Sequence, residues 1–170
     1  MSRSAQGLAP WRWLFTPMLQ ALGLTLLFAT PLRVFGLGLP EPIFPMAAAF
    51  AWAVIRPSVL APACVLVMGL FLDILWGGTL GMWALSMLVA YGVALTGRSM
   101  MAGQSFLILW AWYAGVTALA MVTAELVAML EVQATPNPIG VGWQYLATIV
   151  LYPFSYRLIE RFEDADVRFR

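Results

Sequence analysis

The residues best placed to do chemistry are three ionisable side chains within or beside long apolar runs, Arg33, Asp73 and Glu125. A carboxylate in such a run is costly, roughly 2.5–3.5 kcal/mol at the centre of a membrane helix, so it marks a binding site, a structural ion pair or a partner contact. Gly69, Asp73 and Gly77 recur every four residues and therefore share one face of a helix. Gly78 directly follows Gly77, and such a Gly-Gly pair permits a tight reversal of the chain. The stretch predicts a helix, a turn and a carboxylate close together.

The chain lacks the residues that usually carry out catalysis or bind metal ions. The sequence has no histidine, which removes the commonest proton shuttle and metal ligand. Ser86 and Ser105 therefore have no histidine to activate them as nucleophiles, and the sequence has no H-E-x-x-H pattern. The single cysteine, Cys64, lies in an apolar run, where packing is its expected role. We expect no enzymatic activity, no metal site and no cofactor.

The composition indicates an integral membrane protein. The chain has 170 residues, of which 62% are apolar and 10% charged, and its mean hydropathy is +0.87. A soluble domain has about a quarter charged residues, and so large an apolar excess cannot be hidden inside one small globule. The net charge of +1 gives no basic surface for nucleic acid. We expect a lipid bilayer around the protein and no nucleic-acid partner.

Six apolar segments have spanning or nearly spanning length, which predicts an all-α, polytopic fold in one domain over residues 1–170. The expected helices cover residues 13–35, 43–56, 58–76, 79–97, 104–130 and 141–160, and residues 161–170 form a cytoplasmic tail. The second segment is the shortest, with about 20 Å of helix against a hydrocarbon core of about 30 Å. A broken or irregular helix is expected there, because four prolines surround it: Pro40, Pro42, Pro45 and Pro57.

The arginines favour six spans with both termini in the cytoplasm. In that arrangement Arg33 alone faces outward, and eight arginines lie on the inner side: Arg3, Arg12, Arg56, Arg98, Arg157, Arg161, Arg168 and Arg170. If the second segment does not span, the best alternative places the N-terminus outside, with seven arginines inside and two outside. The positive-inside rule therefore predicts a multi-pass protein with cytoplasmic N- and C-termini.

This topology places Arg33, Asp73 and Glu125 at one depth, near the outer face of the membrane. Arg33 could pair with either carboxylate, and pairing is the normal way to keep a charge inside a membrane. Two interpretations of these three residues stay open. They form either a polar lock within the bundle or an outward-facing binding pocket.

Small residues mark two helix faces, one in the first segment and one around the turn after the third segment. The first face holds Ala21, Thr25 and Ala29, and the second holds Gly69, Gly77 and Gly81. Small side chains let two helices approach closely in a membrane. Each face is therefore a candidate for packing within the bundle or for contact with a partner helix.

The stretch around Asp73 also resembles a known family. The family pattern is Gly-Leu-x-x-Asp-(Ile/Leu)-Leu-x-Gly-x-x-x-Gly, and this chain carries it from Gly69 to Gly81. The run Ala84-Leu85-x4-Ala90-Tyr91 follows, and the last segment contains Pro153 before a basic tail. With its length and its order of segments, the chain resembles the rod-shape-determining protein MreD family.

The resemblance implies a component of the bacterial inner membrane that has no catalytic residue. MreD is associated with MreC and functions with RodA, a class B penicillin-binding protein and, indirectly, the MreB cytoskeleton, in lateral peptidoglycan synthesis and cell shape. The family is also similar in fold to the S components of energy-coupling-factor transporters, six-helix proteins with an outward-facing pocket. We therefore expect a scaffold or partner subunit of the cell-elongation complex that binds MreC. The alternative is an S-component-like subunit that binds a small molecule such as a vitamin, with Arg33, Asp73 and Glu125 around its pocket.

Overall fold

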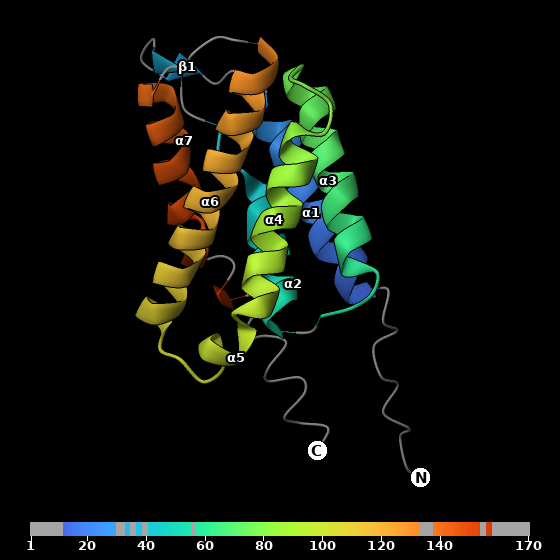
Figure 1. The fold of residues 1–170 in the computed structure, drawn as a ribbon, viewed down its shortest axis with the longest axis vertical. Helices are drawn as coiled ribbons and strands as arrows, with labels where there is room; N and C mark the ends of the chain where they lie inside the picture. The colour runs from blue at the N-terminus through green and yellow to red at the C-terminus, as the bar shows by residue number, and fades with distance from the viewer. Residues whose placement is uncertain are drawn as a thin grey trace.

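The chain folds into α-helices, and the six longer ones run alternately up and down (Figure 1). This computed structural model describes residues 12–29, 33–34, 37–38, 41–55, 57–132, 138–153 and 156–157. The helices are α1 (Arg12–Phe28), α2 (Phe44–Ile55), α3 (Ala61–Trp76), α4 (Met82–Thr96), α5 (Arg98–Met101), α6 (Phe106–Val132) and α7 (Pro138–Val150). The strands β1 (Arg33–Val34) and β2 (Leu37–Gly38) form a short antiparallel hairpin between α1 and α2. The predicted all-α fold class is confirmed for the described part of the chain, apart from this hairpin.

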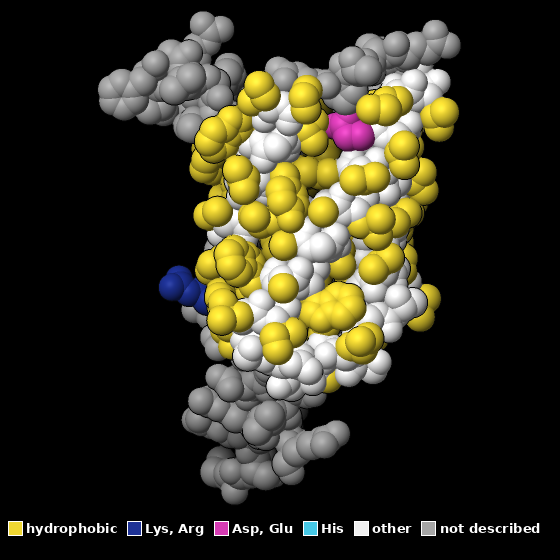
Figure 2. Space-filling view, turned by 60° about the vertical axis from the view of Figure 1, so that its left-hand side comes forward, with side chains coloured by type: hydrophobic (Ala, Val, Ile, Leu, Met, Phe, Trp, Pro, Cys, Tyr) yellow, Lys and Arg dark blue, Asp and Glu magenta, His cyan; other side chains and the backbone are white. Residues whose placement is uncertain are grey.

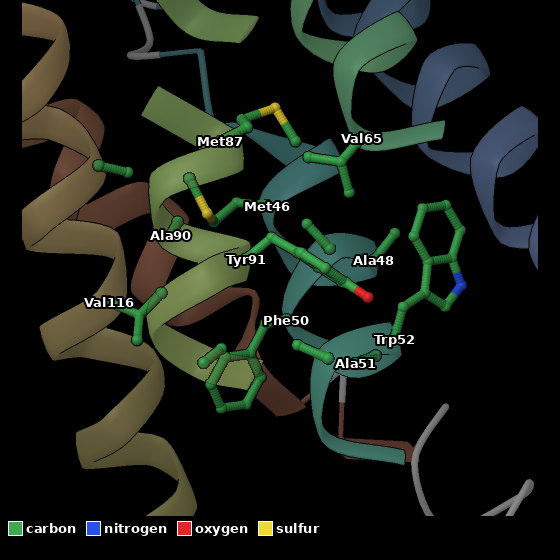
Figure 3. Packing of buried hydrophobic residues seen from close by; sticks show 14 of the residues in the cluster. Met46, Ala48, Phe50, Ala51, Trp52, Val65, Met87, Ala90, Tyr91 and Val116 are labelled. Atoms are coloured by element: carbon green, nitrogen blue, oxygen red, sulfur yellow. The ribbon is translucent and has the colours of Figure 1, made fainter. Parts of the chain in front are cut away.

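The second helix, α2, lies at the centre of the bundle. It contacts α1, α3 and α4, and its residues from Phe44 to Ala53 are all buried. Five of these buried residues are alanines, whose small side chains let the neighbouring helices approach closely: Ala47, Ala48, Ala49, Ala51 and Ala53. Figure 3 shows Met46 directed toward Met87 and Ala90 of α4.

The predicted irregularity of the second helix is wrong, although its shortness is confirmed. α2 is a continuous helix of 12 residues. Pro45 is its second residue, a position where the backbone N–H has no partner within the helix in any case. Pro42 precedes the helix and Pro57 follows it, so neither interrupts its hydrogen bonds. Packing on all sides stabilises a helix of this length, which would be marginal alone.

The first helix is shorter than the predicted segment 13–35. It ends at Phe28, and Ala29 still donates its N–H to the carbonyl of Thr25 at 2.8 Å. Pro31 follows two residues later, and a proline disfavours helical backbone in the residue before it. Arg33 then pairs with Gly38 in the hairpin, so the predicted extension of the helix to residue 35 is wrong.

The last helix also differs from its predicted bounds of 141–160. α7 begins at Pro138, because proline suits the first positions of a helix, and it ends at Val150. Leu151 forms a turn, and the chain is helical again at residues 152–153 and 156–157. Pro153, which has no N–H to donate, lies just after this break. The other four predicted helices agree with the structure to within three residues at each end, whereas α5 was not predicted. The predicted tail, 161–170, lies outside the described residues.

α3 and α4 approach closely where Gly69 faces the backbone of Ala84. A Cβ atom on Gly69 would lie 2.3 Å from the Cα of Ala84 and 2.7 Å from its nitrogen. No side chain fits at such distances, so the contact between the two backbones requires glycine.

We predict that Gly69→Ala destabilises the fold by about 1–3 kcal/mol, because the two helix backbones must move apart. Gly92 of α4 is the matched control, since a Cβ atom there meets nothing within 4 Å. Gly92→Ala should leave the stability unchanged or raise it by up to about 1 kcal/mol, because alanine favours a helix interior. Unfolding of the purified variants, followed by circular dichroism, measures both effects. Equal stability of the two variants would contradict the packing described for Gly69.

The outer surface of the described chain is largely apolar. Of the described residues, 27 large hydrophobic side chains are exposed. Figure 2 shows a face covered mostly by such side chains, with acidic atoms near its upper end and basic atoms toward its lower end. Judged by length and composition, one helix in the described ranges, Phe106–Glu131, is long and apolar enough to cross a membrane. Leu14–Phe28, Phe44–Ile55, Ala61–Trp76 and Met82–Thr96 are shorter apolar helices.

Candidate functional site

The carboxylate of Asp73 holds the start of α4. Asp73 lies in the last turn of α3 and is 1% exposed. Its Oδ2 accepts the N–H of Gly81 and its Oδ1 accepts the N–H of Trp83, each at 2.8 Å. The first N–H groups of a helix have no partner within the helix, and they carry partial positive charge. Asp73 therefore caps α4 from the preceding helix, with two charge-assisted hydrogen bonds.

The turn between α3 and α4 depends on two glycines in the left-handed backbone region. Gly77 ends α3 with φ +63° and donates its N–H to the carbonyl of Asp73, as Gly78 does at 3.2 Å. Gly81 precedes α4 with φ +98°. A Cβ atom on Gly77 or Gly81 would meet nothing within 4 Å. These two positions therefore require glycine for their backbone conformation, whereas Gly69 requires it for close packing.

A second carboxylate, that of Glu41, joins three elements at the same end of the bundle. It accepts the indole N–H of Trp76 in α3, while the backbone carbonyl of Glu41 accepts the side-chain amide of Gln144 in α7 at 3.2 Å. Trp76 packs edge-on against Trp83, with ring centroids 5.2 Å apart and an angle of 72° between the planes. Because Asp73 binds the N–H of Trp83, the tryptophan pair connects the two carboxylates.

Thr148 of α7 extends these polar contacts into the interior. Its fully buried hydroxyl accepts the N–H of Ile43 at 3.1 Å and donates to the carbonyl of Gln144 at 2.7 Å. The carbonyl of Thr148 accepts the hydroxyl of Tyr113 in α6 at 3.3 Å. One residue thus ties the segment before α2 to α6 and α7.

Sequence reasoning missed Glu41, Trp76 and Thr148. A signal for Glu41 existed, because an acidic residue just before a helix faces the positive end of the helix dipole. A weaker signal existed for Thr148, since threonine in an apolar helix often bonds to a neighbouring helix. The tryptophan had no such signal, because its position matched that of an ordinary apolar residue.

Glu125 lies apart from this network, in a groove between α6 and α7. The groove has a volume of about 400 Å³. Its lining is almost entirely apolar and consists of Ala118, Met121, Glu125, Met129, Pro138, Val141, Gly142 and Tyr145. The Oε2 atom of Glu125 is buried and has no hydrogen-bond partner among the described residues.

The structure separates the two predicted carboxylates into different surroundings. Both oxygens of Asp73 are engaged by the start of α4, and Asp73 does not line the groove of Glu125. Arg33 lies in β1, and its side chain falls outside the described residues. The polar lock and the pocket are thus two separate features, one around Asp73 and one around Glu125.

The predicted stripe of small residues on α1 faces the interior. Ala21 and Thr25 are 6% and 3% exposed, and the hydroxyl of Thr25 donates to the carbonyl of Ala21 at 2.8 Å. Ala29 is half-buried at the end of the helix. Because α1 packs against α2 and α3, this chain's own helices cover Ala21 and Thr25.

Asp73 and Thr148 form hydrogen bonds with backbone groups, whereas Glu125 keeps a buried oxygen without a partner among the described residues. Within the described ranges, no three or more His, Cys, Asp or Glu residues gather as they would around a metal ion. Comparisons with protein-family models, curated proteins and solved structures found no match to this chain.

We predict that stability decreases from the wild-type chain to Asp73→Asn and decreases further in Asp73→Leu. Asparagine keeps one accepting oxygen and turns its amide toward the second backbone N–H, whereas leucine leaves both N–H groups buried without a partner. Each unsatisfied group costs about 1–3 kcal/mol, so Asp73→Leu should lose roughly twice as much stability as Asp73→Asn.

Unfolding free energies of the purified variants test this order, with Glu131→Gln as the control. Glu131 is an exposed carboxylate at the end of α6, so its substitution should have little effect. Equal losses for Asp73→Asn and Asp73→Leu would show that the charge of Asp73, and not its hydrogen bonding, stabilises the turn.

Proposed function

We propose that this chain is an integral membrane protein of the bacterial inner membrane. The observation that carries the proposal is the distribution of side chains. Its exterior presents large apolar side chains, including Leu19, Ile74 and Leu107, each more than 60% exposed. Contact with lipid tails is favourable for such a surface, whereas contact with water is unfavourable. The buried carboxylate of Asp73 is hydrogen-bonded inside the protein, as a bilayer requires of a polar group.

The arrangement of the helices supports six spans. The six longer helices alternate in direction, as successive spans must (Figure 1). α6 has 27 residues, about 40 Å of helix, against a hydrocarbon core of about 30 Å. α2 is enclosed by other helices, so its 12 residues need not match the thickness of the lipid.

Charge at the two ends supports the proposed orientation. Arg98 begins α5 at the lower end in Figure 1, and its Nε donates to the carbonyl of Val54 at 3.1 Å. Glu131 lies near the end of α6, at the upper end. By the positive-inside rule, this supports a cytoplasmic position for the end of the bundle that holds α5, which is the side predicted for both termini.

We expect the chain to remain with the membrane fraction after high-salt and alkaline carbonate washes and to enter solution only with detergent. A protein whose apolar surface is buried in lipid stays in the membrane during these washes, whereas a protein attached by electrostatic attraction is released. Fractionation of cells that express the tagged chain measures this. Release by salt or carbonate without detergent would contradict the proposal.

Within the membrane, the chain acts as a non-enzymatic partner subunit of the cell-elongation complex, as its resemblance to the MreD family implies. It binds MreC and works with RodA and a class B penicillin-binding protein, with MreB as an indirect partner. The structural roles of the shared motif support this function. Asp73, Gly77 and Gly81 shape the α3–α4 turn, and Gly69 lets the two helices pack closely beside it. Structural roles of this kind fit a scaffold better than a reaction centre.

The outward face of α1 is the surface that best suits a partner helix. Thr16, Gln20 and Gly23 are exposed there and are spaced four and three residues apart, which aligns them on one side. Small and polar residues on a lipid-facing surface favour contact with another helix, because lipid offers no hydrogen bonds. We therefore place the membrane helix of MreC on this face, opposite the buried Ala21 and Thr25.

We predict that Gly23→Leu and Gln20→Leu reduce the capture of MreC at least about tenfold, which corresponds to 1.4 kcal/mol. A Cβ atom on Gly23 meets nothing within 4 Å, so the substitution leaves the fold of this chain intact. Gly115→Leu is the matched control, since Gly115 is an exposed glycine of α6 with equally open surroundings. Co-purification of tagged variants with MreC measures capture. Undiminished capture by both α1 variants would remove this face from the proposal.

The groove at Glu125 favours a second function, that of an S-component-like subunit that binds a small molecule. Its volume of about 400 Å³ falls within the range of about 300–1,000 Å³ for ligand sites. Mass spectrometry of the gently purified protein separates the two functions. A stoichiometric bound metabolite, together with neighbouring genes for transporter ATPases, would favour the second. Neighbouring genes for MreB and MreC would favour the first.

A further inference from the structure

The groove between α6 and α7 is long and narrow. It extends along α6 from Ala118 to Met129, which is about 16 Å of helix. The groove offers about 400 Å³, which is enough space for an alkyl chain.

Because the lining of the groove is apolar except at Glu125 and Tyr145, it fits an occupant that is apolar along its length and polar at one point. Tyr145, the other lining residue with a polar side-chain group, donates its hydroxyl to the carbonyl of Ala114 at 3.2 Å. The carboxylate of Glu125 is left with a buried oxygen that has no partner among the described residues. A buried carboxylate is costly unless a hydrogen-bond donor or a cation pairs with it.

The depth of Glu125 matches the boundary of the hydrocarbon core. Glu125 lies seven residues before the end of α6, about 10 Å along the helix. Because α6 is about 10 Å longer than the hydrocarbon core, each end projects about 5 Å if the helix is centred. The carboxylate then lies about 5 Å from the headgroup layer, within reach of a lipid headgroup that leans inward.

We propose that the groove binds a bilayer lipid with a primary ammonium headgroup. One alkyl chain lies against Met121, Val141 and Gly142, and the ammonium group donates to the carboxylate of Glu125, which lines the groove. The proposal rests on the membrane placement proposed above. It adds a specific ligand to the chain, and it requires neither MreC nor an enzyme.

Native mass spectrometry of the detergent-purified protein tests headgroup recognition. The probes are phosphatidylethanolamine, phosphatidylcholine and phosphatidylglycerol with matched acyl chains. The first offers ammonium N–H donors, the second a cation without N–H groups, and the third an anion. We expect phosphatidylethanolamine to be retained about fivefold over each of the other two, as one charged pair would give. Glu125→Gln should abolish this preference, and Glu131→Gln, on the same helix outside the groove, should keep it.

A second pair of variants tests the alkyl site. A Cβ atom on Gly142 or Gly140 of α7 meets nothing within 4 Å, so leucine at either position fits the fold. Gly142 lines the groove and Gly140 does not. Gly142→Leu should lower the retention of all three lipids severalfold, whereas Gly140→Leu should not. This pair keeps the test valid even if Glu125→Gln folds poorly.

Equal retention of the three lipids by the wild-type chain, or a preference that survives Glu125→Gln, would overturn the proposal. A photoreactive residue at Ala118 that forms adducts with a protein rather than a lipid in intact cells would also overturn it. Failure of the membrane placement is distinguishable, because the chain would then be recovered without detergent. A chain that needs detergent and captures MreC, yet shows no headgroup preference, refutes the lipid site alone.

Discussion

The pairing of the Asp73 carboxylate with the first N–H groups of α4 is the constraint on which the bundle depends. It fixes where α4 begins relative to the last turn of α3, because both oxygens are committed to defined atoms. One turn earlier on α3, Gly69 lets the two backbones meet at Ala84. These contacts set the register of α3 against α4. α4 in turn packs against α2 and α6, so the same register positions the centre of the fold.

Two other buried polar side chains, those of Ser86 and Thr148, are also satisfied by hydrogen bonds to the backbone. Ser86 donates to the carbonyl of Met82 at 2.6 Å, and Thr148 bonds both within its helix and to the segment before α2. In an apolar environment a polar group without a partner is costly. The bond between Thr148 and Ile43 therefore also specifies which segments meet, whereas Ser86 is satisfied within its own helix. The interior thereby gains defined positions that apolar contacts alone would leave adjustable.

The sequence was a good guide to local features and a poor one to burial. The Asp73 stretch was predictable, because its glycines and carboxylate follow helical spacing and turn chemistry. The spacing of Ala21 and Thr25 identified a face of α1, yet it could not tell whether that face pointed inward. In a soluble helix polar residues mark the outside, but α1 carries polar residues on both sides, Thr16 and Gln20 outward and Thr25 inward, so periodicity loses that signal. The central position of α2 and the contacts of Thr148 were hidden for the same reason.

The complete enclosure of α2 also has a consequence for biogenesis. In the proposed membrane placement, a segment of 12 residues is too short to be held in the bilayer by its own apolar surface. Its stability comes from α1, α3 and α4, and two of these are synthesised after it. The nascent chain must therefore hold α2 in a provisional position until α4 has emerged, and only then does the segment reach its final place. The centre of this protein is therefore secured only after helices that follow it in the sequence have emerged.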